Sequence, residues 1–126
     1  MRYLIDTHVF IGLLIDQGIP PYIKEIIKDR KYIKYISIVS LWEIVIKQNL
    51  NKLKLDYNID EMLDEINDSS INVLQIEYRY LEVYSHLPLI HRDPFDRLLI
   101  STALADGMTI ITSDEDIQKY EIDWIF

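Results

Sequence analysis

The chain contains no cysteine, and this absence excludes disulfide bonds and metal centres with thiolate ligands. A reducing compartment suits such a composition, so we expect a cytoplasmic protein. Glycine is also scarce, because only Gly12, Gly18 and Gly107 are present. The glycine-rich loops that cradle nucleoside phosphates or dinucleotides need several glycines at close spacing. Neither kind of loop can form here.

Long apolar runs are missing as well. The stretch from Val9 to Ile15 is short, contains Gly12 and follows Asp6 and His8, which a secretory signal does not allow. No segment approaches the ~20 consecutive apolar residues of a membrane-spanning helix. We therefore expect neither a signal peptide nor a membrane partner. A chain of 126 residues with 49% hydrophobic content instead has the size of one domain with a sizeable core.

The net charge of −8 is distributed unevenly along the chain. Residues 1–54 contain nine Lys and Arg against five Asp and Glu, whereas residues 55–126 contain four against sixteen. An acidic protein is a poor general binder of polyanions. A basic half beside an acidic pocket can nevertheless bind a nucleic-acid backbone and present it to a metal ion. The alternative is that these lysines only keep helix surfaces soluble.

Apolar periodicity predicts strands that alternate with helices. Strands are expected at residues 2–6, 35–38, 71–76 and 108–113, with an edge strand at 123–126. Helices are expected at residues 7–15, 20–30, 40–50, 58–68, 78–87 and 94–106, with a short helical turn at 114–120. This alternation predicts a single α/β domain over residues 1–126, with a central parallel sheet of four to five strands and helices on both faces.

Carboxylates recur at one kind of position in this plan. In an open parallel sheet, ligands bind at the carboxyl ends of the strands, where helix N-termini also converge. Asp6 ends the first strand, and Asp114 follows the fourth. Glu43 lies in the first turn of the helix expected at 40–50, and Asp93 and Asp96 lie at the start of the helix expected at 94–106. Four separate segments should therefore bring acids to one edge.

Most of these acids also have an ordinary structural explanation. Glu43 would complete a capping box with Ser40, and Asp93 would cap the helix that begins at Pro94. Asp114 would cap the short helical turn. Asp6 is harder to explain in this way, because it follows a buried strand directly.

Several carboxylates at one edge repel each other and are costly to bury unpaired. No Lys or Arg is obviously placed to neutralise all of them, and Arg92 and Arg97 are the close candidates in sequence. A divalent cation would relieve the repulsion, and ligands that are all oxygen favour Mg²⁺ or Mn²⁺ over Zn²⁺. Such a site suits the hydrolysis of phosphodiester bonds.

Three segments resemble the PIN-domain ribonucleases, and specifically the VapC-type toxins of bacterial type II toxin–antitoxin systems. They are LIDTHVFIGLL at 4–14, SIVSLWEIVIKQNLNKLKL at 37–55 and HRDPFDRLLISTALADGMTIITSD at 91–114, with the region of Tyr120 beyond. Residues 56–90 match only in general character. The resemblance implies a metal-dependent endoribonuclease that cleaves single-stranded RNA and is inhibited by a cognate antitoxin protein.

The resemblance also implies roles for individual residues. The catalytic Mg²⁺ site, in which Mn²⁺ can substitute, would consist of Asp6, Glu43, Asp96 and Asp114. Asp93 and Asp116 are weaker candidates for the same site. We further expect a homodimer, and an apolar surface on the helices of residues 20–66 that the antitoxin covers.

The remaining polar and aromatic candidates come from the residues themselves. We expect RNA contacts from Lys47 and Lys52 of the basic half and from Arg92 and Arg97.

Other side chains near the acids receive structural interpretations. We interpret Trp42 as a core residue rather than a platform for base stacking, and His91 as a loop or surface residue. Thr112 lies at the rim of the expected site, where it is a candidate for orienting water or phosphate.

A second class of function stays open, which is a catalytically silent PIN-like module that acts by protein binding. The presence of all four acids favours the enzyme.

Overall fold

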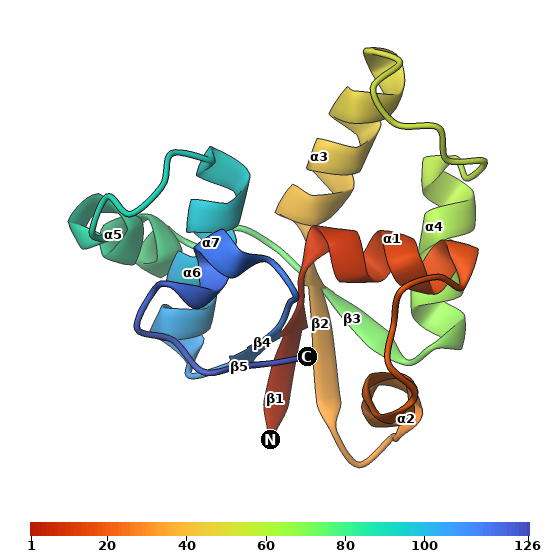
Figure 1. Cartoon of the computed structure of the whole chain (residues 1–126), viewed down its shortest axis with the longest axis horizontal. Helices are drawn as coiled ribbons and strands as arrows, with labels where there is room; N and C mark the ends of the chain where they lie inside the picture. The colour runs from red at the N-terminus through yellow and green to blue at the C-terminus, as the bar shows by residue number, and fades with distance from the viewer.

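The computed structural model describes all 126 residues and has one five-stranded sheet at its centre (Figure 1). The strands are β1 (Arg2–Ile5), β2 (Ile33–Ser37), β3 (Ile71–Leu74), β4 (Thr109–Ile111) and β5 (Trp124–Ile125). They lie in the order β3-β2-β1-β4-β5, and every neighbouring pair is parallel. The predicted α/β domain with a parallel sheet is therefore confirmed.

Seven helices surround the sheet on both faces. They are α1 (Thr7–Ile15), α2 (Pro21–Lys28), α3 (Ile38–Asn49), α4 (Ile59–Asp68), α5 (Tyr78–His86), α6 (Pro94–Asp106) and α7 (Glu115–Gln118). Helices α1, α2 and α4 lie to one side of the sheet, and α5, α6 and α7 lie to the other (Figure 1). No helix combines the length and the apolar character that crossing a membrane requires.

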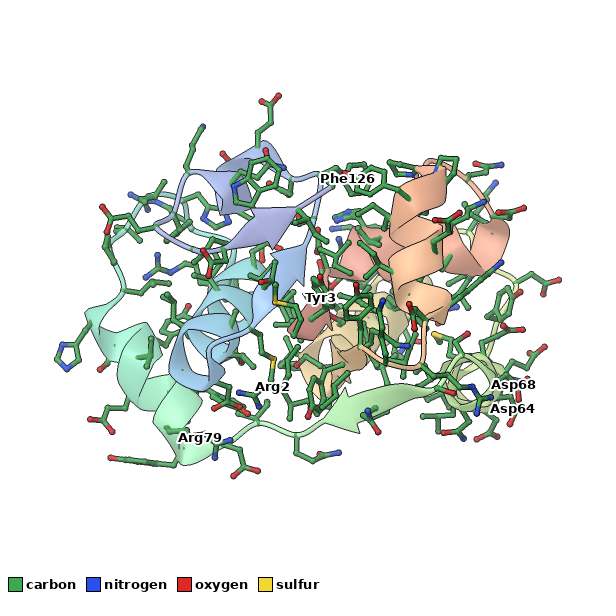
Figure 2. The ribbon with its side chains drawn as sticks, turned by 90° about the horizontal axis from the view of Figure 1, so that it is seen from below. Arg2, Tyr3, Asp64, Asp68, Arg79 and Phe126 are labelled. Carbon is green, nitrogen blue, oxygen red and sulfur yellow. The ribbon has the colours of Figure 1, made fainter.

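The central strand β1 supplies both halves of the core. Successive side chains of a strand point to opposite faces. Tyr3 and Ile5 pack with buried side chains of α1, α2 and α4, whereas Leu4 packs with those of α6 and α7. Figure 2 shows Tyr3 in the middle of the molecule. Because β1 is buried from both sides, the residue that follows it is also withdrawn from solvent.

Helix α6 begins and ends where its sequence predicts. Asp93 caps it, because its Oδ1 accepts hydrogen bonds from the backbone N–H groups of Phe95, at 2.9 Å, and Asp96, at 3.1 Å. Gly107 ends the helix in the left-handed conformation, with φ of 64°. The start of α6 therefore lies at the carboxyl edge of the sheet, which is the upper edge in Figure 1.

The predicted start of α3 is wrong by two residues. Ser37, not Ser40, is the N-cap, and its Oγ accepts a hydrogen bond from the N–H of Val39 at 3.1 Å. The reason is that β2 extends to Ser37 and the helix follows without a loop. Glu43 consequently lies in the second turn of the helix. Ser40 is buried, and its Oγ accepts a hydrogen bond from the hydroxyl of Thr7 at 2.8 Å.

The opposite end of α6 carries an acid that is fully paired. Asp106 accepts hydrogen bonds from Arg79, at 2.8 and 3.0 Å, and from the hydroxyl of Tyr80, and its backbone carbonyl accepts one from Arg2. Arg2 and Arg79 lie on the same side of the molecule, away from Asp64 on α4 (Figure 2). The hydrogen bonds from Arg79 lower the pKa of Asp106 below its usual value.

Gly12 in α1 allows the turn that follows the helix to pack closely against it. A Cβ at this position would lie 2.7 Å from the carbonyl oxygen of Gln17 and 2.8 Å from Cδ1 of Ile19. Helix propensity alone favours alanine over glycine by ~1 kcal/mol. We expect the clash with a backbone oxygen to outweigh this, so that Gly12→Ala lowers the free energy of unfolding by roughly 1–3 kcal/mol. Urea denaturation measures the change.

The matched control is Asp64→Ala, which adds the same residue at an exposed position of α4. This variant should be neutral or stabilising. A Gly12→Ala protein as stable as the wild type would show that the turn after α1 moves aside.

Candidate metal and active site

Asp6 follows β1 and is completely buried. Its Oδ2 accepts a hydrogen bond from the hydroxyl of Thr112 at 2.7 Å, whereas its Oδ1 has no partner. Thr112 follows β4, the neighbour of β1, and its Oγ1 in turn accepts the N–H of Asp114 at 3.0 Å. Thr112 therefore orients the Asp6 carboxylate and is not itself free to hold water or phosphate at the rim.

Glu43 enters the same edge from α3. Its side chain is 2% exposed, and its Oε2 forms an ion pair with Lys47 at 2.9 Å, one turn further along the helix. Its Oε1 is buried and has no hydrogen-bond partner. Glu43 thus resembles Asp6, because one carboxylate oxygen of each has a partner in the protein and the other has none.

Asp96 is the third buried acid, and it lies in the first turn of α6. Its Oδ2 lies 3.2 Å from Nε2 of His91. Burial raises the pKa of Asp96 to about 7, and the negative charges of Asp93, Asp6 and Asp114 add to this shift, while the hydrogen bond from His91 opposes it. The carboxylates of separate segments are therefore close enough for their charges to interact.

The pKa of Asp6 is raised in the same way. Burial is the main cause, with a contribution from the charge of Asp114, and the hydrogen bond from Thr112 and the charge of His8 oppose it. Asp106, which has arginine partners, shows the opposite shift. Burial is the main influence on the pKa of Asp6 and Asp96, whereas the hydrogen bonds from Arg79 are the main influence on that of Asp106.

The other acids of the predicted set are tied to helix ends. Asp114 caps α7, since its Oδ1 accepts the N–H groups of Asp116, at 2.8 Å, and Ile117, at 3.3 Å. Asp93 caps α6 in the same manner. Asp116 is exposed and pairs with Lys119 at 3.2 Å. Asp114 and Asp93 each keep one carboxylate oxygen outside the capping bonds, whereas Asp116 is engaged at the surface.

The donor set fits a hard divalent cation. A buried carboxylate oxygen normally has a partner, so the two unpartnered atoms, Asp6 Oδ1 and Glu43 Oε1, are available for one. All candidate ligands are oxygens, as Mg²⁺ and Mn²⁺ prefer. No three acidic or histidine side chains are arranged here closely enough to enclose an ion. A bound ion would therefore need these side chains to rotate toward one another.

The basic candidates for RNA contact lie in different environments. Lys52 and Arg92 are exposed, and Lys47 is partly exposed beside Glu43. Arg97 is only 6% exposed, and its guanidinium donates to protein oxygens. A contact between Arg97 and RNA stays a prediction, which this burial disfavours.

One neighbour of the acids differs from its sequence interpretation, and another agrees with it. Trp42 is 57% exposed, so its interpretation as a core residue is wrong; its ring packs edge-on against Phe95 with centroids 5.3 Å apart. His91 is a loop residue, but it is partly buried and hydrogen-bonded to Asp96. Its place five residues before Asp96, within HRDPFD, was the only signal in the sequence.

The raised pKa of Asp96 predicts how pH affects the metal-free protein. The folded state holds this proton more tightly than the unfolded state, whose pKa is near 3.8. The resulting stability is fully present below pH 3.8 and is lost as the pH rises through about 7. We expect Asp96→Asn to remove this loss, which amounts to about 1.4 kcal/mol for each unit of pKa shift.

Urea denaturation in a chelator, repeated across this pH range, gives the comparison. Asp6 titrates in the same direction, and its charge raises the pKa of Asp96, so the difference between the two curves reports Asp96 together with its interaction with Asp6. Parallel curves for wild type and Asp96→Asn would contradict the assignment.

Comparison with known proteins agrees with this architecture. No curated protein matches the sequence. Among solved structures, a chain of VapBC2 from Rickettsia felis, crystallised with a DNA fragment from its promoter, is 18% identical with a TM-score of 0.73. The alignment covers 99% of this chain and 98% of that one.

Two further structures give the same result. A chain of a toxin-antitoxin complex from Klebsiella pneumoniae is 17% identical, with a TM-score of 0.64 and coverage of 98% of this chain and 96% of that one. A chain of FitAcB from Neisseria gonorrhoeae is 16% identical, with a TM-score of 0.60 and the same coverage. At such identities these likenesses show the fold alone. The model of the PIN domain matches residues 3–123, and the chain therefore belongs to the PIN domain family.

Proposed function

We propose that the chain is a Mg²⁺-dependent endoribonuclease that hydrolyses phosphodiester bonds in single-stranded RNA and acts as the toxin of a toxin–antitoxin pair. The observation that carries this proposal is the pair of buried, unpartnered oxygens of Asp6 and Glu43, beside an Asp96 whose pKa is raised by burial and by its acidic neighbours. Membership of the PIN family supports the nuclease. The toxin–antitoxin complexes among similar structures support the biological setting.

Asp6, Glu43, Asp96 and Asp114 would hold the ion. When bound, Mg²⁺ supplies the positive charge that activates water and stabilises the phosphate oxygens during hydrolysis. The protein contributes orientation, because Thr112 fixes one oxygen of Asp6 and leaves the other for the metal. It also contributes proton control, because Asp96 has to release its proton before its carboxylate can bind a cation.

The substrate would approach along the basic part of α3 and the segment after it. Rotation of Glu43 toward the metal would release Lys47 from its ion pair. Lys47 and the exposed Lys52 could then contact successive phosphates, and exposed Arg92 could contact the chain near the start of α6. Because these contacts are with the backbone, they carry no base specificity.

The test of the proposal is cleavage of unstructured RNA by purified chain, free of any antitoxin, with and without Mg²⁺. We expect Asp6→Asn to lower the cleavage rate by at least about 100-fold, because the ion that supplies positive charge at the reacting phosphate loses a charged ligand. Asp60→Asn, an exposed acid on α4, is the matched control and should retain full activity.

Two outcomes would oppose the proposal in different ways. A wild-type chain that binds Mn²⁺ but cleaves no RNA would favour the alternative of a catalytically silent interaction module. Cleavage that is equal in chelator and in Mg²⁺ would exclude the metal from the reaction.

An antitoxin segment is proposed to bind between α1, α2 and α4. Ile23 and Ile27 of α2 and Met62 and Ile66 of α4 are buried in the core, whereas Tyr22 and Ile59 are exposed, so only part of the apolar surface expected on residues 20–66 is accessible. A groove of about 370 Å³ remains, with Phe10 and Leu13 among its apolar lining and Lys24, Lys28 and Glu65 among its charged lining. Such a groove suits an amphipathic helix with polar residues of both signs at its margins.

A second copy of the chain is proposed to cover the apolar groove between α3, α5 and α6. This groove of about 270 Å³ is lined almost entirely by apolar side chains, among them Trp42, Leu81 and Phe95. Trp42 and Leu81 are 57% and 49% exposed. Aromatic residues are enriched in protein interfaces, and a two-fold axis buries the same patch on both copies.

Sedimentation velocity tests this homodimer. We expect the wild type to sediment as a dimer and Trp42→Glu as a monomer, because the substitution places two like charges at the two-fold interface. Tyr22→Glu changes an exposed aromatic residue on α2 and should leave the dimer intact. A wild-type chain that stays monomeric at high concentration would remove the homodimer from the proposal.

A further inference from the structure

A buried arginine without a carboxylate partner lies next to the acidic site. Arg97 donates through NH1 to the carbonyl oxygen of Pro88 at 2.9 Å and through NH2 to that of Leu87 at 3.2 Å. The same NH1 donates to the hydroxyl of Tyr120 at 2.9 Å. The arginine thus ties the loop before α6 to the residue that follows α7.

The hydrogen bonds of Tyr120 determine where its hydroxyl proton points. A phenol has one proton to donate and can accept two hydrogen bonds. The Tyr120 oxygen accepts from Arg97 and, at 3.3 Å, from the backbone N–H of His91. Its own proton is left for Nδ1 of His91 at 2.8 Å, since the alternative acceptor, the His91 carbonyl oxygen, is 3.5 Å away.

This proton placement fixes the tautomer of the imidazole. When Nδ1 accepts a hydrogen bond, a neutral ring carries its proton on Nε2. Nε2 lies 3.2 Å from Oδ2 of Asp96, so it donates to that oxygen. The hydrogen bonds therefore run in one direction, from Arg97 through Tyr120 and His91 to Asp96.

We propose that His91 is a positioning residue for the metal site. It holds Oδ2 of Asp96, so that Oδ1 is presented to the cation. Tyr120 and Arg97 hold His91 in the tautomer and orientation that this requires. The inference rests on the proposed function, because it assumes that Asp96 binds a metal. Carboxylate ligands in metal sites are commonly hydrogen-bonded by a second layer of residues, and loss of such a residue weakens metal binding 10- to 100-fold.

A merely structural role, in which the imidazole only holds its loop in place, explains the contacts less well. The loop that carries His91 is already attached through backbone groups, namely the carbonyl oxygens of Leu87 and Pro88 to Arg97 and the N–H of His91 to Tyr120. None of these bonds uses the imidazole ring. The ring contributes the edge-on contact with the Tyr120 ring, with centroids 5.4 Å apart, the hydrogen bond that Nδ1 accepts from the Tyr120 hydroxyl, and the hydrogen bond to Asp96.

Three substitutions separate these roles. His91→Phe keeps an aromatic ring against Tyr120 but removes both the donor to Asp96 and the acceptor of the Tyr120 hydroxyl. His91→Gln restores a donor, because the amide nitrogen of glutamine reaches about the position of Nε2. His86→Phe changes an exposed histidine at the end of α5 and is the matched control.

The first readout is Mn²⁺ affinity of the RNA-free protein, measured by electron paramagnetic resonance of the unbound ion. We expect a 10- to 100-fold loss in His91→Phe, recovery in His91→Gln to near the wild-type value, and no change in His86→Phe. Melting temperatures without metal identify any variant that is weakened by misfolding. Equal Mn²⁺ affinities of wild type and a folded His91→Phe would overturn the proposal.

The second readout needs no metal and uses nitrogen NMR of the histidine rings. We expect His91 in the wild type to be protonated at Nε2 and unprotonated at Nδ1, and Tyr120→Phe to abolish the hydrogen bond at Nδ1. A proton on Nδ1 of neutral His91 in the wild type would overturn the direction of the relay.

The two proposals fail in distinguishable ways. Mn²⁺ binding that depends on His91, without RNA cleavage, would contradict the proposed nuclease activity and leave the positioning role of His91 intact. RNA cleavage that depends on Asp6 but not on His91 would support the nuclease activity and contradict the positioning role of His91. A wild-type chain that binds no Mn²⁺ would overturn both.

Discussion

Unpaired negative charge at the carboxyl edge of a buried parallel sheet is the constraint on which the rest of this structure depends. Asp6 is completely buried because β1 is covered from both faces, and the edge where it lies also receives Glu43 and Asp96. Isolated charges in such surroundings are strongly disfavoured unless they are paired. Asp106, at the other end of α6, shows how this chain pairs an acid when nothing else is to bind there.

The protein compensates the buried acids with neutral donors. Thr112 binds one oxygen of Asp6 and His91 binds one oxygen of Asp96. Helix N-termini contribute a positive electrostatic potential at the same edge, because α1, α3 and α6 all begin there (Figure 1). Neutral donors and helix dipoles stabilise a carboxylate without neutralising it, so an oxygen of each acid stays available.

The sequence was informative wherever structure depends on neighbours along the chain. Asp6 after a buried strand, Asp93 before Pro94, and Gly107 after α6 could all be predicted from local patterns, and with them the parallel sheet. The error at Ser40 has a local cause too, because two serines three residues apart are both acceptable caps and only the length of β2 decides between them.

What the sequence could not provide is contact between distant segments. Tyr120 and His91 are 29 residues apart, and their hydrogen bond depends on how α7 returns to the loop before α6. The exposure of Trp42 likewise depends on what packs around α3, because its helix is apolar on more than one face. Arg97 was expected to contact RNA, and only the fold shows that it is buried and donates to carbonyl oxygens of the protein.

The ion pair between Glu43 and Lys47 has a consequence for the order in which ligands bind. In a protein that binds Mg²⁺ as proposed, the ammonium group of Lys47 acts as an internal counterion that the metal displaces. Displacement of Lys47 from Glu43 would free its ammonium group to bind a phosphate. The same metal ion would neutralise the carboxylates that otherwise repel that phosphate. The two ligands would then show positive thermodynamic linkage, and each would raise the affinity of the other by the same factor. Metal-free protein, with Lys47 engaged and its buried acids uncompensated, would bind RNA more weakly than the metal-bound protein.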